Sequence, residues 1–126
     1  MSTPARPAPR RFPSGVYGTG SEPDPRFSLA NERTFLAWVR TSLALLAVGV
    51  ALEALDLPVH PGLRLAAALV FLALGVLAPV QAWRGWTGVE RALREGRPLP
   101  APVMAAPLAA GTAVAGMLLV AGLLLA

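Results

Sequence analysis

The chain alternates between charged stretches and long apolar ones, at a spacing typical of membrane-spanning helices. Residues 25–57 begin as an amphipathic helix, with arginine at every seventh position, and become apolar without an intervening proline. Two further apolar stretches follow, each long enough to cross the roughly 30 Å of bilayer hydrocarbon as a helix. The pattern predicts an all-α integral membrane protein with three transmembrane helices, at about residues 35–57, 63–83 and 103–126.

Local signals predict where these helices begin and end. Asp24 followed by a proline is typical of a helix N-terminus, so the first helix extends on the cytoplasmic side of its span as an amphipathic segment. Pro79 predicts a kink near the end of the second span. Glu90 and Arg94 are four residues apart, a spacing that supports continuation of this helix until Gly96 ends it.

Residues 1–23 are rich in proline and glycine and show no hydrophobic period, which predicts a disordered tail. Its arginines Arg6, Arg10 and Arg11 are not followed by the apolar stretch of a signal peptide, so we expect no cleavage. The predicted organisation is therefore this tail followed by one three-span membrane domain, residues 24–126.

The distribution of arginine predicts the orientation in the membrane. The N-terminal region and the loop between the second and third spans are arginine-rich, whereas the loop between the first and second spans carries only Arg64. Because basic residues accumulate in cytoplasmic loops, the N-terminus is predicted to be cytoplasmic and the C-terminus external. All three tryptophans then fall on the cytoplasmic side.

Composition agrees with this class and excludes several others. The chain is 55% hydrophobic and only 14% charged, as expected for a membrane protein. Its net charge of +4 does not indicate nucleic-acid binding, because no soluble domain is left to carry a basic groove. There is no cysteine, and the lone His60 between prolines is expected to be a solvated turn residue. No nucleophile, phosphate-loop or metal-ligand motif is present, so we expect no catalytic residues, no metal, no cofactor and no enzymatic activity.

The arginines of the first helix form the first candidate site. Arg26, Arg33 and Arg40 are seven residues apart and therefore form one stripe along the helix. This stripe continues inward as the small residues Ala37, Ala44, Ala47 and Ala51. One interpretation is that the arginines reach lipid phosphates beside a helix-packing face. The other is that they face the interior of an oligomer and bind a polyanion, for which the planar guanidinium is well suited.

Two further arginines, Arg84 and Arg91, lie at the same predicted depth on the second helix. Together the two helices would form a basic collar at the cytoplasmic mouth, and any pore would require several copies because three helices cannot enclose an aqueous path. The alternative is that these are ordinary positive-inside arginines, one of them balanced by Glu32. The candidate anion-binding residues are Arg26, Arg33, Arg40, Arg84 and Arg91.

The remaining polar residues of the first helix are candidates for a polar network. Asn31 lies on the side opposite the arginine stripe, where it would either form hydrogen bonds across helices or meet lipid headgroups, and Glu32 is its neighbour. Glu53 is expected to be buried near the external interface, whereas Asp56 is expected to be solvated.

Specific residues also carry a family resemblance. The run Asn31-Glu32-Arg33-Thr34-Phe35-Leu36 followed by Trp38, together with Trp83-Arg84 after the second span, resembles the YidH-like family of small bacterial inner-membrane proteins, domain of unknown function 202. The same domain resembles the small subunit and membrane domains of the eukaryotic vacuolar transporter chaperone complex, which makes polyphosphate and moves it across a membrane. The resemblance covers residues 24–126.

The resemblance implies an inner-membrane, oligomeric protein in which Arg33 and Arg84 lie at the cytoplasmic mouth of a polyphosphate path. Arg40 departs from the eukaryotic pattern. The function that the resemblance favours is binding or conduction of polyphosphate or another polyanion. The alternative is a non-conducting membrane scaffold or accessory subunit that stabilises a partner complex. The expected partners are the bilayer, other copies or other membrane subunits, and polyphosphate or anionic lipid, but no nucleic acid.

Overall fold

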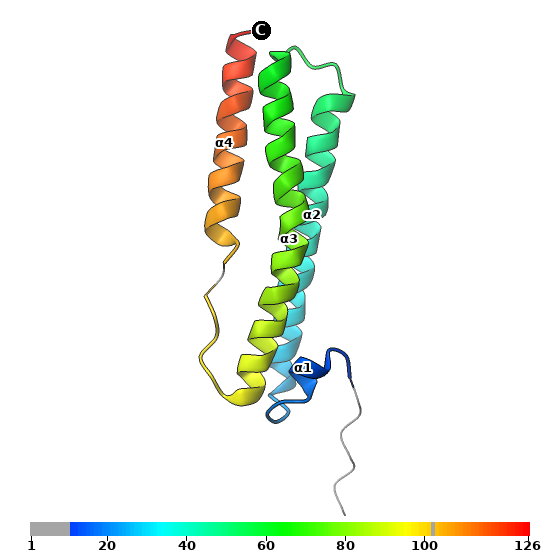
Figure 1. Cartoon of the computed structure of the whole chain (residues 1–126), viewed down its shortest axis with the longest axis vertical. Coiled ribbons are helices and arrows are strands. Elements are labelled where there is room, and N and C mark those ends of the chain that lie inside the picture. Colours follow the sequence, from blue (N-terminus) through cyan, green and yellow to red (C-terminus); the bar gives the residue numbers. More distant parts are fainter. Residues whose placement is uncertain (1–10, 102) are drawn as a thin grey trace, which may run out of the picture.

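A computed structural model describes residues 11–101 and 103–126. It contains three long helices, α2 (Pro25–Ala54), α3 (Pro61–Glu95) and α4 (Ala105–Leu124), preceded by the short α1 (Ser14–Tyr17). The long helices lie side by side with alternating directions (Figure 1). Each is long and apolar enough to cross a membrane, which confirms the predicted all-helical, three-span fold.

The helices begin and end at residues that satisfy their free backbone groups. At the start of α2, a carboxylate oxygen of Asp24 accepts a hydrogen bond from the backbone N–H of Arg26 at 2.9 Å. At the start of α3, Nδ1 of His60 accepts from two backbone N–H groups at 3.2 and 3.4 Å. Gly96 ends α3 with a φ of 66°, a left-handed conformation that favours glycine. His60 is therefore an exposed turn residue, as expected, and also a helix cap.

Helix α3 runs without interruption through Pro79 to Glu95. At 1.5 Å per residue it is roughly 52 Å long, so its last part extends beyond the hydrocarbon layer. The expected pairing of Glu90 with Arg94 is wrong. Each of these side chains instead bonds to a segment outside α3, as described below.

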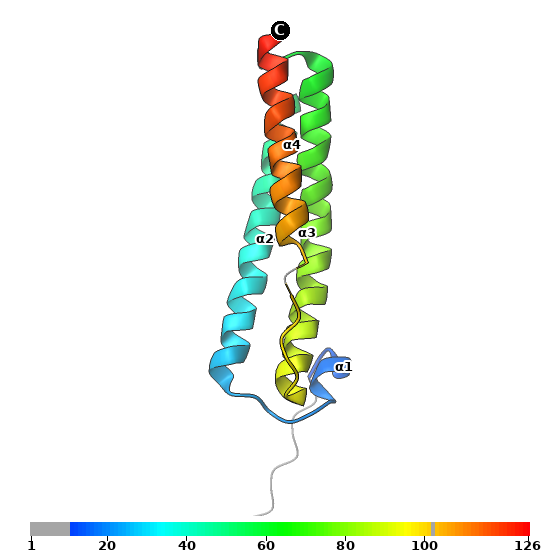
Figure 2. The ribbon, with the colours of Figure 1, turned by 90° about the vertical axis from the view of Figure 1, so that its left-hand side faces the viewer.

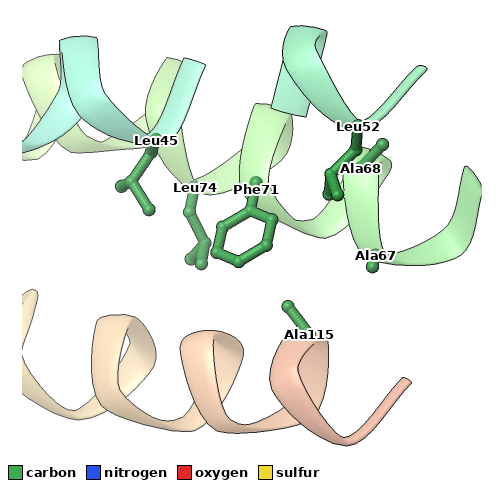
Figure 3. Close-up of a cluster of buried hydrophobic side chains, with 7 residues drawn as sticks. All are labelled: Leu45, Leu52, Ala67, Ala68, Phe71, Leu74 and Ala115. Atoms are coloured by element: carbon green, nitrogen blue, oxygen red, sulfur yellow. The ribbon is translucent and has the colours of Figure 1, made fainter. Parts of the chain in front are cut away.

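We call the end that carries the α2–α3 connection the loop end, and the opposite end, where α2 starts and α3 stops, the open end. Near the loop end the helices pack through a small apolar core (Figure 3). A Cβ atom added to Gly75 would lie 2.7 Å from Cγ of Leu46, so α2 and α3 approach closely here. The core residues are Leu45, Leu52, Ala67, Ala68, Phe71, Leu74 and Ala115.

Helix α3 is the central element, because α1, α2 and α4 each pack against it. Helix α4 begins only at Ala105 and accompanies the loop-end part of α3. Along the open end an extended linker takes its place, described for residues 97–101 and 103–104 (Figure 2). The open end therefore consists of two long helices flanked by the linker and by the N-terminal segment that carries α1.

The N-terminal segment, residues 11–23, belongs to the tail for which the sequence predicts disorder. Here it contains α1 and returns along the open end of α3, where the backbone N–H of Ser21 donates to the carbonyl of Arg94 at 3.0 Å. Arg6 and Arg10, which entered the orientation argument, lie outside the described residues.

Candidate functional site

The arginine stripe of α2 lies on the side of the helix opposite α3. Arg26, Arg33 and Arg40 are all exposed, whereas the side of α2 that faces α3 buries Asn31 and Ser42. Arg26 forms an ion pair with Asp24 at 2.8 Å, and this contact lowers the pKa of the Asp24 carboxyl. No described acidic side chain lies within 4.0 Å of the other two guanidinium groups. Two of the three charges are thus unpaired among the residues that the structure describes.

The small residues that continue the stripe are accessible as well. Ala37, Ala44 and Ala47 are exposed and Ala51 is half-buried. Such a surface allows the backbone of another helix to approach closely. The outward side of α2 therefore combines unpaired cations with a face suited to helix packing.

The two candidate arginines of α3 do not join this stripe within one chain. Arg91 is exposed, and its Nε donates to the backbone carbonyl of Gly15 at 3.2 Å, so it binds the N-terminal segment. Arg84 lines a groove beside Asn31 and Trp38. The five candidate residues are therefore spread over separate surfaces, and a collar would need more than one copy.

A buried polar network joins α2 to α3 at the open end. Nδ2 of Asn31 donates to Oε1 of Glu90 and to the carbonyl of Trp86, both at 3.1 Å. The hydroxyl of Ser28 donates to the other carboxylate oxygen of Glu90, also at 3.1 Å. Glu90 is only 2% exposed, so its carboxylate depends on these donors. Of the two interpretations of Asn31, a hydrogen bond across helices or contact with lipid headgroups, the structure shows the hydrogen bond across helices.

Glu32 is exposed, and among the described residues no hydrogen bond joins it to Asn31; the partners of Asn31 and Ser28 are on α3, at Glu90. The sequence interpretation missed Glu90. A signal was present: Ala78, Ala82, Glu90 and Arg94 fall on one row at multiples of four residues, and all four are buried on α3. A charged residue that continues a row of small buried ones indicates a helix contact.

Arg94 fastens the N-terminal segment to α3. Its guanidinium donates to the carbonyls of Thr19 at 2.8 Å and Tyr17 at 3.0 Å, and forms an ion pair with Glu22 at 3.2 Å. The side chain is only 5% exposed. A buried guanidinium with several oxygen partners is well satisfied, so Arg94 is a structural residue, although the sequence had assigned it to a pair with Glu90 and not to the N-terminal segment.

Two hollows flank the Asn31–Glu90 contact. The first, about 490 Å³, lies under the N-terminal segment, and its cations Arg11 and Arg94 both pair with Glu22. The second is a groove of about 280 Å³ between α2, α3 and the linker. The first hollow also receives the acids Glu32 and Glu90 and the aromatic residues Tyr17, Phe35, Trp83 and Trp86.

At the loop end, Arg64 joins the two helices near their connection. It forms an ion pair with Glu53 at 3.4 Å and donates to the carbonyl of Leu57 at 3.0 Å. The side chain of Glu53 is 40% exposed, so the expectation that it is buried is wrong; it pairs from the surface with the largely buried side chain of Arg64. Asp56 is fully exposed, as expected. Over the described residues, no three His, Cys, Asp or Glu side chains gather in a metal-binding group.

Comparison with known proteins assigns the family. The family model described as "Domain of unknown function (DUF202)" matches residues 26–92. An uncharacterized protein of Mycobacterium tuberculosis is 44% identical over 110 residues, which make up 86% of this chain and 89% of the relative. Inner membrane protein YidH of Escherichia coli is 47% identical over 83 residues, 64% of this chain and 71% of YidH. No solved structure matches the chain significantly. With its three candidate spans, the chain therefore belongs to the DUF202 family and is a multi-pass inner-membrane protein.

Proposed function

We propose that this protein assembles into an oligomer in the membrane and that the outward arginines of α2 bind a polyanion such as polyphosphate. It acts by binding or conduction and not by catalysis. The observation that supports this proposal is the pair of exposed, unpaired arginines, Arg33 and Arg40, which continues directly into exposed alanines. Charged side chains close to the hydrocarbon layer are unfavourable without a partner, which favours an anion from outside the chain as the partner of these arginines.

The spacing of the stripe favours a chain-like anion. Arginines seven residues apart on a helix are about 10 Å apart along its axis. A lipid headgroup offers its phosphate to one such position, whereas an extended polyphosphate offers phosphates to all of them. Several copies of α2 around one axis would multiply these contacts, and the planar guanidinium binds phosphate oxygens in pairs.

The proposal includes an orientation. The open end, which carries most of the arginines, faces the cytoplasm, and the C-terminus lies outside together with the α2–α3 connection. The C-terminus and the α2–α3 connection lie on the same side of the membrane, since α4 ends at the loop end (Figure 1). A reporter that is active only outside the cytoplasm should therefore be active when it is fused to Ala126. Activity at the same position of a reporter that works only in the cytoplasm would overturn the orientation.

The test is native mass spectrometry of the detergent-purified protein with and without short-chain polyphosphate. We expect a defined oligomer that retains the polyanion. The double variant Arg33→Gln, Arg40→Gln should keep the oligomer and lose the polyanion. As a control, Arg97→Gln removes one charge from an arginine that already pairs with Glu95 at 2.6 Å, and it should retain polyphosphate. Equal retention by the double variant contradicts the proposal.

A second candidate function is a non-conducting scaffold that stabilises a partner complex. The exposed alanines favour it, because they would pack against a partner helix whether or not the arginines bind an anion. In that case Ala44→Leu should release a co-purifying membrane subunit while leaving polyphosphate without effect. The double arginine variant should not release it.

A further inference from the structure

The groove beside Arg84 arises from the way the chain enters α4. Because α4 starts at Ala105, the open-end part of α3 is covered by the extended linker, which does not fill the space that a helix would fill. The resulting groove of about 280 Å³ is bounded by Phe35 and Trp38 of α2, by α3 from Gln81 to Val89, and by the linker up to Met104. It is a built feature of three elements and not a gap at a chain end.

Glycine keeps the floor of this groove open. A Cβ atom added to Gly85 would meet no other atom within 4 Å, whereas one added to Gly75 in the core would collide with Leu46. The glycine at position 85 thus lies against empty space. Most of the surrounding side chains are apolar or aromatic, so the groove is suited to a hydrocarbon chain.

The charge of the groove has one sign. Among the described residues that line it, Arg84 alone is charged, and no described acidic side chain lies within 4.0 Å of its guanidinium. The hollow on the other side of the Asn31–Glu90 contact differs, because its arginines are already paired with Glu22. An anion is therefore attracted to the groove and not to the other hollow.

The position of the groove along the helices identifies the ligand class. Trp38 and Trp86 line it, and indole rings prefer the membrane–water interface, where lipid headgroups lie. We propose that the groove binds an anionic phospholipid, with the headgroup phosphate on Arg84 and an acyl chain along Trp38 and Met104. This site is separate from the outward stripe of α2, so it does not rest on polyphosphate binding.

The experiment offers the purified full-length protein an equimolar mixture of phosphatidylglycerol and phosphatidylcholine and counts bound lipids by native mass spectrometry. We expect about fivefold preference for phosphatidylglycerol, the increment that one arginine provides toward a lipid of net negative charge. Phosphatidylcholine also carries a phosphate, but its choline group offsets the charge. Arg84→Gln should abolish this preference and Arg84→Lys should preserve it. Gly85→Leu, whose Cβ atom meets no other atom within 4 Å, places a bulky side chain in the groove and should lower the retention of both lipids.

Two matched variants control for charge and for side-chain bulk. Arg97→Gln makes the same charge change outside the groove, and Gly116→Leu adds the same side chain to α4, where a Cβ atom also meets nothing within 4 Å. Both should bind lipid as the wild type does. The proposal is overturned if the wild type shows no preference, if Arg84→Gln keeps it, or if Gly85→Leu retains as much lipid as Gly116→Leu. A preference that survives the Arg33→Gln, Arg40→Gln change separates this site from the polyanion proposal.

Discussion

The loop end and the open end of the α2–α3 pair are held together by different forces. At the loop end, α4 completes a three-helix contact in which Phe71 and Leu74 meet residues with small side chains. At the open end α4 is absent, and the pair is joined through the buried carboxylate of Glu90 and the amide of Asn31. The loop end is close-packed, whereas both hollows lie at the open end.

This difference shows how a small membrane protein can be stable and still have surfaces available for ligands. Close packing of small residues leaves no room for another molecule. A polar contact specifies the position of two helices with few atoms and leaves space on either side of it. The proposed ligands of this protein accordingly belong to the open end and to the outward side of α2.

The comparison is tested most strongly at the loop end. Gly75→Leu should push α2 away from α3, since its first side-chain atom already collides with Leu46, and we expect a loss of about 3 kcal/mol in the free energy of unfolding. Titration with sodium dodecyl sulfate, followed by circular dichroism, measures it. Gly116→Leu is the matched control, and equal stability of the two variants would show that the loop end is not close-packed.

A smaller effect is expected at the open end. Asn31→Leu removes the amide that donates to the buried carboxylate of Glu90, and we expect a loss of about 2 kcal/mol in the same titration. Glu32→Gln alters an exposed neighbour and should change stability by less than about 0.5 kcal/mol. If both variants behave alike, the polar network does not hold the open end.

The N-terminal segment should respond locally. Arg94→Gln removes the hydrogen bonds that hold residues 17–22, so amide hydrogen exchange in this segment should accelerate about tenfold while exchange in the loop-end core stays unchanged. Arg91→Gln removes a single exposed bond to Gly15 and should have less effect. Faster exchange throughout the core would mean that Arg94 supports the whole fold.

The smallest effect concerns the first turn of α2. The ion pair with Arg26 lowers the pKa of Asp24 below its ordinary value of 3.8, so the cap is present at neutral pH and is lost as the pH falls through the lowered value. The amide chemical shift of Arg26, whose N–H donates to Asp24, should titrate with a midpoint below 3.8. A midpoint at or above this value contradicts the pairing. Asp24→Asn should abolish the titration.

The helical architecture could be predicted because a bilayer leaves few alternatives. A segment that crosses hydrocarbon must satisfy its own backbone, so an apolar stretch of sufficient length predicts a helix. The cap at Asp24 and the end at Gly96 follow from equally local rules. The central place of α3 did not follow, because it depends on which helix faces are complementary, and apolar helices in lipid carry little directional pattern.

The candidate site was predictable only where it faces outward. Periodicity alone placed Arg33 and Arg40 on one surface, and the structure leaves both exposed. The contact between Asn31 and Glu90 joins residues 59 positions apart, so it depends on the register of two helices. The fastening of the N-terminal segment by Arg94 also joins distant residues, and the composition of that segment gave no sign of it.

The central place of α3 has a consequence for biogenesis. Because α2 and α3 precede α4 in the chain, they reach the membrane first and can form their contact before α4 is synthesised. Helix α4 then docks onto a prepared surface of α3, where its glycines Gly111 and Gly122 lie against Leu74 and Leu63. A defect in α4 therefore affects a late step of assembly, after α2 and α3 have packed together. A defect in α3, in contrast, removes the surface against which every other helix packs.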